Sequence, residues 1–333
     1  MPAIDSKTSR EYQAAWEGVA LIDRSALGRL EVTGADSLDL LHRLSTQDLH
    51  RLERDQGDVT ILTSEKGRVI DLVAVHHFGD RLVLVTSADN QQAVASWLDK
   101  YTIIEDSATR DLTAETGLLA FFGTRADELA ERLAGRQLSD LPPFHLAPTT
   151  MAGARVVLAR AREPAGGGFH VIVLDRGRVG AVRAAIMATG ESLGIQPIGP
   201  ASYEMLRIEA GLPLFGREMD DRYNPLEVGL EPFISFNKGC YIGQEVVARL
   251  DTYDKVQKRL MGLLLPEGAL AHSGAKLLAE GKDAGMVTSA TITPAGDRPI
   301  ALAYVRSKHA APGVHLVLET GGEAEVVGLP FRG

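Results

Sequence analysis

The only cysteine of this 333-residue chain lies in the stretch "NKGCYIGQEV", between two glycines and close to a lysine. Cys240 precedes a helical pattern that begins just after Gly243, so the free amides of that helix and the ammonium of Lys238 favour thiolate over thiol. Gly239 and Gly243 also allow a ligand to approach the main chain closely. The pattern predicts a reactive thiol at Cys240, and a buried structural thiol is the alternative.

Other residues that could do chemistry give weaker signals. His76 and His77 are adjacent in a predicted strand and point to opposite faces, which is poor geometry for joint metal binding. The chain has no CxxC or HExxH spacing, and one cysteine cannot hold an iron-sulfur cluster by itself. No metal site is therefore predicted. Asp71 follows the hairpin turn of "TSEKGRVID", where a single strand carboxylate is more often at the surface than catalytic.

Composition limits the class of protein. Thirty-five Lys and Arg against 44 Asp and Glu give a net charge of −9, which argues against general attraction to nucleic acid or anionic lipid. A single cysteine excludes an internal disulfide, and the start "MPAIDSKTSREYQ" lacks the apolar core of a secretory signal. No apolar run approaches the roughly 18 residues of a membrane span. A cytoplasmic protein that does not cross a membrane is expected.

The elements that would position these residues alternate between helix and strand. Asp36 is placed to cap the helix "ADSLDLLHRL", and three strands follow in "DVTILTSEKGRVIDLVAVHHFGDRLVLVTS". A later helix opens at Thr124, with Asp127 in the capping-box position. After residue 257 short β runs separated by turns predict a barrel. We therefore expect an α+β protein with three domains: 1–110, 111–257 and 258–333.

A short helix and a long irregular segment precede the cysteine stretch. Pro200 and Gly211 bound the helix "ASYEMLRIEA", which places Arg207 and Glu209 near its end. An exposed carboxylate is the ordinary expectation for such a glutamate. Residues 211–236 string Gly, Pro and aromatic residues without periodicity, and their apolar content argues against disorder. We interpret them as an ordered loop that lines a pocket.

These stretches together carry a family resemblance. "KGCYIGQE" resembles the signature of the YgfZ-type folate-binding proteins, within the larger family of the glycine-cleavage T-protein, or aminomethyltransferase. The similarity extends through "LHRLSTQDL", "TSEKGRVIDLV", "LRIEAGLPLFGREMD" and the terminal β domain, and relatives include mitochondrial iron-sulfur assembly factors. The resemblance implies a T-protein-like three-domain ring with a central tetrahydrofolate channel, two α+β domains and a C-terminal β barrel.

The resemblance also assigns residues. The T-protein segment R-x-E-x-G is matched by Arg207, Glu209 and Gly211, and in that family the glutamate binds the pterin ring. A carboxylate accepts hydrogen bonds from the pterin amino group and ring N–H more strongly than a neutral group would. The residues implied to bind the cofactor are Glu209, Arg207, Asp71, Tyr241 and Gln244, and those implied to be catalytic are Cys240 and Lys238.

Two departures from the T-protein pattern shape the functional hypothesis. Asp71 is followed by Leu72 where T-proteins have a second Asp, so no glycine-cleavage activity is expected, and Cys240 is present where ordinary T-proteins lack it. The first hypothesis is a folate-binding accessory protein for assembly or repair of iron-sulfur enzymes, including those that thiolate tRNA. Its partners would be reduced folate and iron-sulfur enzymes or assembly proteins. The alternatives are a tetrahydrofolate-dependent aminomethyl or methyl transferase and a pure binding module.

Overall fold

The computed structural model describes residues 5–332 except 254, 270 and 295–298. Its internal contacts divide the chain into two compact units. Unit 1 comprises the described residues of Met1–Tyr12, Gly199–Glu231 and Glu245–Gly333, and unit 2 comprises Gln13–Ile198 and Pro232–Gln244. Each unit therefore joins segments that lie far apart in the sequence, and each is described by itself.

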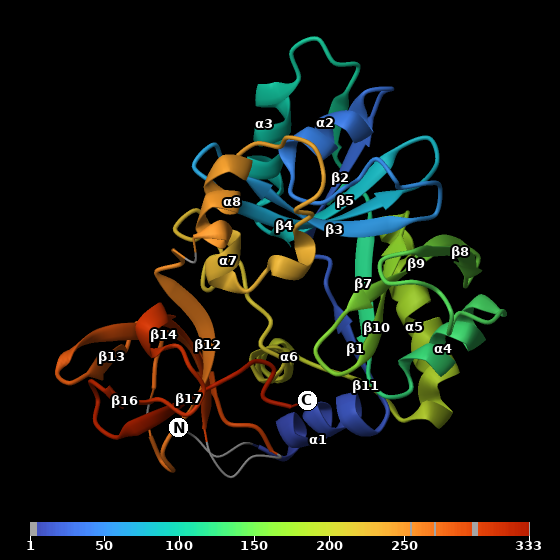
Figure 1. Ribbon diagram of the computed structural model, residues 1–333. Coiled ribbons are helices and arrows are strands. Elements are labelled where there is room, and N and C mark those ends of the chain that lie inside the picture. Colours follow the sequence, from blue (N-terminus) through green and yellow to red (C-terminus); the bar gives the residue numbers. More distant parts are fainter. Residues whose placement is uncertain (1–4, 254, 270, 295–298, 333) are drawn as a thin grey trace. The chain divides into compact units, whose positions relative to one another are not determined.

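Unit 1 contains a closed β barrel in the order β12-β15-β14-β13-β16-β17 (Figure 1). Its strands are β12 (Lys258–Leu264), β13 (Lys276–Ala279), β14 (Lys282–Thr291), β15 (Ile300–Arg306), β16 (His315–Leu318) and β17 (Glu323–Val327). Alternating apolar residues such as Leu263, Val287 and Ala303 fill the barrel interior. The barrel predicted after residue 257 is confirmed.

Helices complete unit 1. They are α6 (Pro200–Glu209), α7 (Pro225–Val228) and the 3₁₀ turn η4 (Ser307–His309), while α1 (Ser6–Glu17), α8 (Gln244–Thr252) and the turn η3 (Glu231–Phe233) contribute residues to both units. Both α6 and α7 start with proline, which suits the first helical turn. A capping box fixes the start of α7, because Asn224 accepts a bond from the Glu227 amide while Glu227 accepts one from the Asn224 amide.

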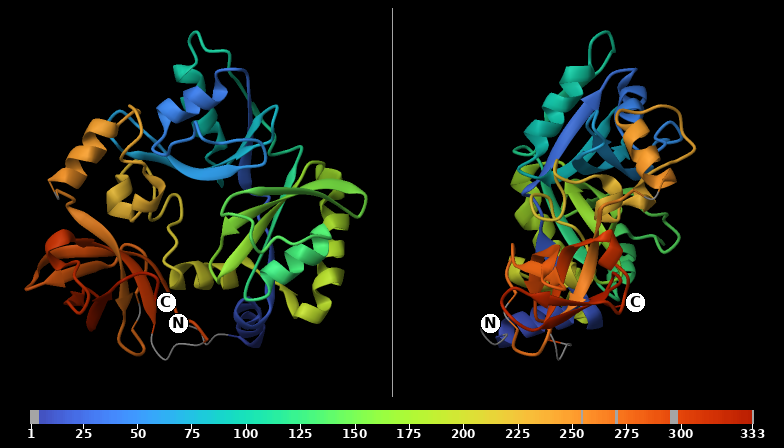
Figure 2. Two further views of the ribbon diagram at one scale, coloured as in Figure 1. Left: turned by 45° about the vertical axis from the view of Figure 1, so that its right-hand side comes forward. Right: turned by 60° about the vertical axis from the view of Figure 1, so that its left-hand side comes forward.

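Unit 2 contains a six-stranded sheet in the order β11-β1-β7-β10-β9-β8. Its strands are β1 (Val19–Asp23), β7 (Gly117–Phe122), β8 (Leu146–Met151), β9 (Ala154–Arg162), β10 (Gly167–Val173) and β11 (Ile195–Pro197). The accompanying helices are α4 (Ala126–Ala134), α5 (Val179–Gly190) and the turns η1 (Arg176–Arg178) and η2 (Glu191–Leu193). Figures 1 and 2 show α4 and α5 side by side on one face, where Leu129 and Ile186 join a core with Phe121.

A five-stranded sheet, in the order β3-β4-β5-β2-β6, packs against the other face of the first. It comprises β2 (Leu27–Thr33), β3 (Gly57–Thr63), β4 (Val69–His77), β5 (Leu82–Ala88) and β6 (Ala108–Asp111), with helices α2 (Ser37–Leu44) and α3 (Gln91–Tyr101). Side chains alternate along β5, so Leu84 packs with the α2 and α3 residues while Val85 packs with the six-stranded sheet.

The predicted helix starts differ from the structure in their caps. Helix α4 begins at Ala126 after Arg125, and neither Thr124 nor another side chain caps it. Asp127 pairs instead with Arg160 of β9, 2.9 Å away, so a tertiary contact replaces the expected capping box. Asp36 precedes α2 as expected, but its carboxylate accepts a bond from the Asp106 amide rather than capping the helix.

Candidate functional site

Helix α6 brings Glu209 to a buried position at its last residue. The helix starts with Pro200 and ends at Glu209, and Gly211 follows the cap residue Ala210 with a φ of +69° that favours glycine. A Cβ on Gly211 would lie 2.8 Å from Cβ of Leu329, so the space is also restricted. Glu209 is buried inside unit 1, although a surface position is usual for a glutamate near a helix end.

The carboxylate of Glu209 is held by residues from the two ends of the chain. The Tyr12 hydroxyl donates to Oε2 at 2.6 Å, and Nε of Arg332 lies 3.2 Å from Oε1. Burial and the neighbouring carboxylate both raise the pKa of Tyr12, so the phenol remains a donor. A carboxylate has about four lone-pair positions, so these two contacts leave acceptor capacity for a further donor.

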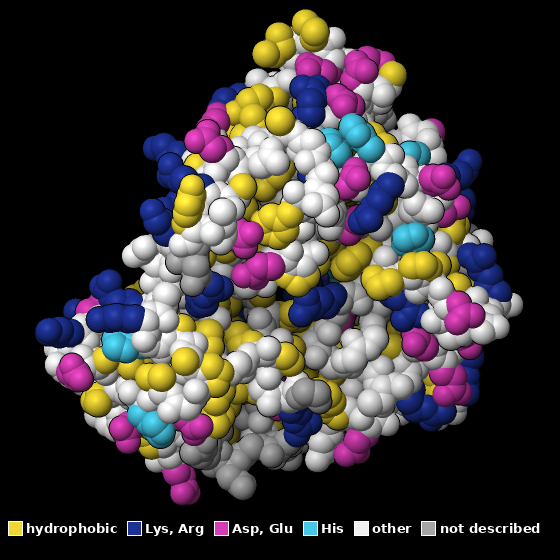
Figure 3. Space-filling model, in the orientation of Figure 1, with side chains coloured by type: hydrophobic (Ala, Val, Ile, Leu, Met, Phe, Trp, Pro, Cys, Tyr) yellow, Lys and Arg dark blue, Asp and Glu magenta, His cyan; other side chains and the backbone are white. Residues whose placement is uncertain are grey.

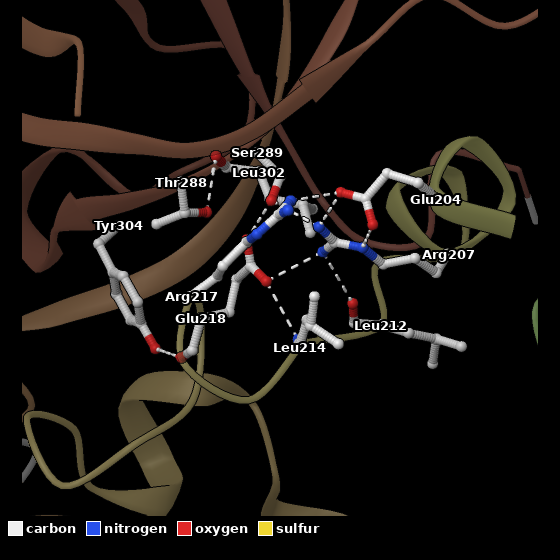
Figure 4. A network of polar contacts seen from close by, with 10 residues as sticks. All are labelled: Glu204, Arg207, Leu212, Leu214, Arg217, Glu218, Thr288, Ser289, Leu302 and Tyr304. Atoms are coloured by element: carbon white, nitrogen blue, oxygen red, sulfur yellow. Dashed lines mark hydrogen bonds and ion pairs between the residues drawn. The ribbon is translucent and has the colours of Figure 1, made fainter. Parts of the chain in front are cut away.

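Arg207 lies in a buried ionic network on the same helix (Figure 4). Its guanidinium bonds Glu204 through Nε at 2.9 Å and Glu218 through Nη1 at 2.9 Å. It also donates to Oγ of Ser289 on β14 at 2.6 Å and to the carbonyl of Leu212 at 3.3 Å. Arg207 thus ties α6 to the following loop and to the barrel, and its predicted role in cofactor binding stays a prediction.

Glu218 is the member of this network that the sequence did not single out. Its side chain is fully buried and accepts bonds from the Leu214 amide at 3.0 Å and from Ser289 Oγ at 2.7 Å. The Tyr304 hydroxyl donates to its main-chain carbonyl (Figure 4). The signal in the sequence is the charged stretch "GREMDD" within an otherwise apolar loop. A carboxylate that such a loop buries needs a cationic partner, so the stretch could have indicated a buried ion pair.

In unit 2 Lys238 is buried and holds the turn that follows α2. Its Nζ donates to the carbonyl oxygens of His42 at 2.5 Å, Ser45 at 2.8 Å and Gln47 at 2.8 Å. Burial lowers the pKa of Lys238 to about 8. These three acceptors use the three N–H donors of the ammonium. The predicted catalytic partnership of Lys238 with Cys240 therefore depends on its charge rather than on a donated hydrogen bond, and it stays a prediction.

Cys240 is exposed and lies four residues before the start of α8. Gly243 has φ of +84°, and a Cβ there would lie 2.5 Å from the Ser64 carbonyl oxygen, so glycine is required. Oε1 of Gln244 accepts a bond from the Tyr241 amide at 3.3 Å. The Tyr241 ring is buried, with Nζ of Lys238 5.3 Å from its centroid, and burial raises its pKa to about 12.

Asp71 on β4 is also buried in unit 2. Its carboxylate accepts bonds from Ser87 Oγ at 2.6 Å and the Ser87 amide at 3.0 Å. Burial raises the pKa of Asp71 to about 6, and these bonds limit the rise. Leu72 lies on the opposite face of the strand and is half-buried. The carboxylate expected near a surface thus faces the interior of the unit.

The structure groups the predicted residues by unit. Unit 1 holds Arg207 and Glu209, and unit 2 holds Asp71 and the signature residues Lys238, Cys240, Tyr241 and Gln244. Sequence reasoning missed Tyr12 and Arg332, which contact Glu209 from distant parts of the chain.

Comparison with known proteins identifies the family. Residues 2–238 match the model of the GCVT N-terminal domain, and residues 258–332 match that of the glycine cleavage T-protein C-terminal barrel domain. The chain therefore belongs to the glycine cleavage T-protein, or aminomethyltransferase, family. The narrower resemblance to YgfZ-type proteins stays a prediction.

Individual relatives agree with this assignment. The chain is 32% identical to an aminomethyltransferase of Symbiobacterium thermophilum, over 99% of this chain and 91% of the relative. It is 31% identical to a chloroplastic protein of Arabidopsis thaliana that is named as a transferase, over 89% of this chain and 67% of the relative. The crystal structure of aminomethyltransferase T from Bartonella henselae has the same fold, with a TM-score of 0.86, 24% identity and coverage of 97% and 89%. Among the described residues, no helix has the length and apolar content to span a membrane.

Proposed function

We propose that this protein binds tetrahydrofolate and transfers a one-carbon unit, aminomethyl or methyl, to or from it. The observation that carries the proposal is the buried carboxylate of Glu209, in a chain whose two family matches are to T-protein domains. The pterin amino group and ring N–H are donors, and the acceptor positions of Glu209 left by Tyr12 and Arg332 suit them. The names of the relatives support transfer as the reaction.

Calorimetry with reduced folate tests the binding step. Replacing Glu209 by Gln removes one acceptor and turns an amide donor toward pterin donors, which should cost roughly 1–3 kcal/mol, or about five- to a hundredfold in affinity. Tyr12→Phe, which keeps the carboxylate but removes its orienting hydroxyl, should weaken binding less. The exposed Glu245→Gln is the control and should bind as wild type does. Unchanged affinity in Glu209→Gln would remove this residue from the site.

A second candidate function is support of iron-sulfur enzymes, including tRNA-thiolating ones, with folate bound and Cys240 as the working thiol. It is favoured by the exposure of Cys240 and by Leu72, which cannot protonate a folate nitrogen. Turnover of an aminomethylated carrier protein would favour the transferase. The second candidate would be favoured if the protein bound folate without turnover. It would also require that cells lacking the protein regain iron-sulfur enzyme activity with wild type but not with Cys240→Ala.

A further inference from the structure

Two histidines and an aspartate gather where α2 ends. His42 lies in the last turn of α2, and Asp48 and His50 lie in the segment after it. One potential ligand atom of each residue lies within 4.8 Å of those of the other two. The rings of His42 and His50 are stacked, with centroids 3.7 Å apart and planes 3° from parallel. Figure 3 shows histidine side chains gathered at the surface over α2.

The His42 ring has an unsatisfied nitrogen in this cluster. Its Nδ1 is buried and makes no hydrogen bond within the part of the chain that the structure describes. The nearest carboxylate oxygen of Asp48 is 3.3 Å from it. Zinc binds imidazole nitrogen and carboxylate oxygen at about 2.0–2.2 Å in tetrahedral sites, which sets neighbouring ligand atoms about 3.3 Å apart. The distance between His42 Nδ1 and Asp48 Oδ1 therefore matches that of two neighbouring ligands of one metal ion.

Neighbouring residues hold the cluster in place. Lys238 fixes the turn between α2 and Asp48 through its bonds to three carbonyl oxygens. Asp39 Oδ1 lies 3.1 Å from Nε2 of His50, as carboxylates do when they orient metal-binding histidines. The Lys238 ammonium opposes a second cation, whereas the carboxylates of Asp39 and Asp48 attract one. Because an imidazole coordinates a metal in its ring plane, the half-exposed His50 would turn out of its stack with His42 to direct a nitrogen at the same ion.

We propose that His42, Asp48 and His50 bind a divalent transition metal ion of the zinc class and leave a fourth position open to water. Two imidazoles and one carboxylate suit such ions, whereas calcium and magnesium prefer oxygen ligands. This site goes beyond the proposed function, because metal binding by these three residues does not require folate. The sequence predicted no metal site because the spacing 42, 48 and 50 matches neither CxxC nor HExxH.

Titration of the full chain with ZnCl₂ tests the site, by calorimetry on tag-free protein freed of metal with EDTA. Every variant carries Cys240→Ser, because an exposed thiol also binds zinc. The parent should bind one zinc ion per chain, and MgCl₂ should not compete. His50→Ala and Asp48→Asn should each weaken binding by about ten- to a hundredfold or more, and Asp39→Asn by a similar or smaller factor. His50 and Asp48 are chosen because buried His42 is needed for packing.

His315→Ala is the matched control, since the side chains of His315 and His50 are 54% and 51% exposed. It should leave zinc affinity unchanged. Addition of Co²⁺ should give a visible absorption band in the parent that is lost in His50→Ala, while circular dichroism of the two proteins coincides. Equal zinc affinity in the parent, His50→Ala and Asp48→Asn would overturn the proposal, as would a parent that binds no zinc.

Discussion

The buried charges around Arg207 in unit 1 and three buried charges of unit 2 are stabilised in different ways. In unit 1 the guanidinium of Arg207 contacts the carboxylates of Glu204 and Glu218, and Glu209 faces Arg332. Burial alone lowers the pKa of Arg207, but the two carboxylates outweigh it and raise the pKa above its ordinary value. The buried charges of Arg207, Glu218 and Glu209 are therefore paired with opposite charges.

In unit 2 three buried charged groups are held by neutral ones. Lys238 donates to three carbonyls, Asp71 accepts from Ser87, and Arg29 donates to Thr116 Oγ1 and to carbonyls that include that of Thr116. Burial lowers the pKa of Lys238 and Arg29 and raises that of Asp71, so each shift favours the uncharged form. Removal of a partner should therefore harm unit 1 most, whereas a change of pH should affect unit 2.

Arg207→Met should give the largest loss of stability. It leaves the fully buried carboxylate of Glu218 without a cation, and breaking a buried ion pair from one side costs about 3–5 kcal/mol. Arg217→Met is the control, because Arg217 is half exposed, pairs with the same Glu204 and should cost at most about 1 kcal/mol. Urea unfolding measures both variants. Equal losses would show that burial of the pair does not matter, and Glu218→Gln added to Arg207→Met should restore part of the stability.

Lys238→Met should give a smaller loss, of about 1–3 kcal/mol, because it leaves the carbonyls of His42, Ser45 and Gln47 without their donor but also removes a buried charge. Hydrogen exchange should rise in α2 and residues 45–50 and not in the barrel. Lys66→Met, which changes an exposed lysine of the same unit, is the control and should leave exchange as in wild type. Undiminished protection of α2 in Lys238→Met would contradict the anchoring role.

Asp71→Asn should change how stability depends on pH. The pKa of Asp71 is raised from 3.8 to about 6, so the folded protein binds this proton more tightly than the unfolded chain does. The protonated carboxyl of Asp71 contributes its whole stabilisation to the free energy of unfolding below about pH 3.8. This contribution is lost as the pH rises through about 6. The unfolding free energy of Asp71→Asn relative to wild type should rise over this window. The exposed Asp80→Asn is the control, and parallel curves for wild type and Asp71→Asn would refute the shift.

Alkylation of Cys240 by iodoacetamide should show the smallest effect. The thiol is exposed, so it should react in the folded protein without denaturant. Lys238→Met should slow the reaction near neutrality by less than about threefold, because the donors of the ammonium are engaged by carbonyls and a charge that does not contact the thiol is screened. A much larger slowing would restore Lys238 as the direct partner of Cys240.

Local sequence signals determined much of this protein. Pro200 and Gly211 indicated the two ends of α6, and Gly243 indicated the start of α8. The turn residues after 257 separated the predicted strands of the barrel. These signals act within a few residues, through backbone dihedral preferences and side-chain periodicity, and for that reason they can be read without a structure. The motifs "LRIEAG" and "KGCYIGQE" likewise pointed to the family.

Tertiary structure alone decided which groups meet. Tyr12 and Arg332 reach Glu209 from 197 and 123 residues away, and Lys238 finds its acceptors nearly 200 residues earlier in the chain. A tertiary contact with Arg160 on β9 likewise replaced the cap expected at Asp127. Burial and pairing depend on how whole units fold around a charge, and local propensity carries no information about partners that far along the chain.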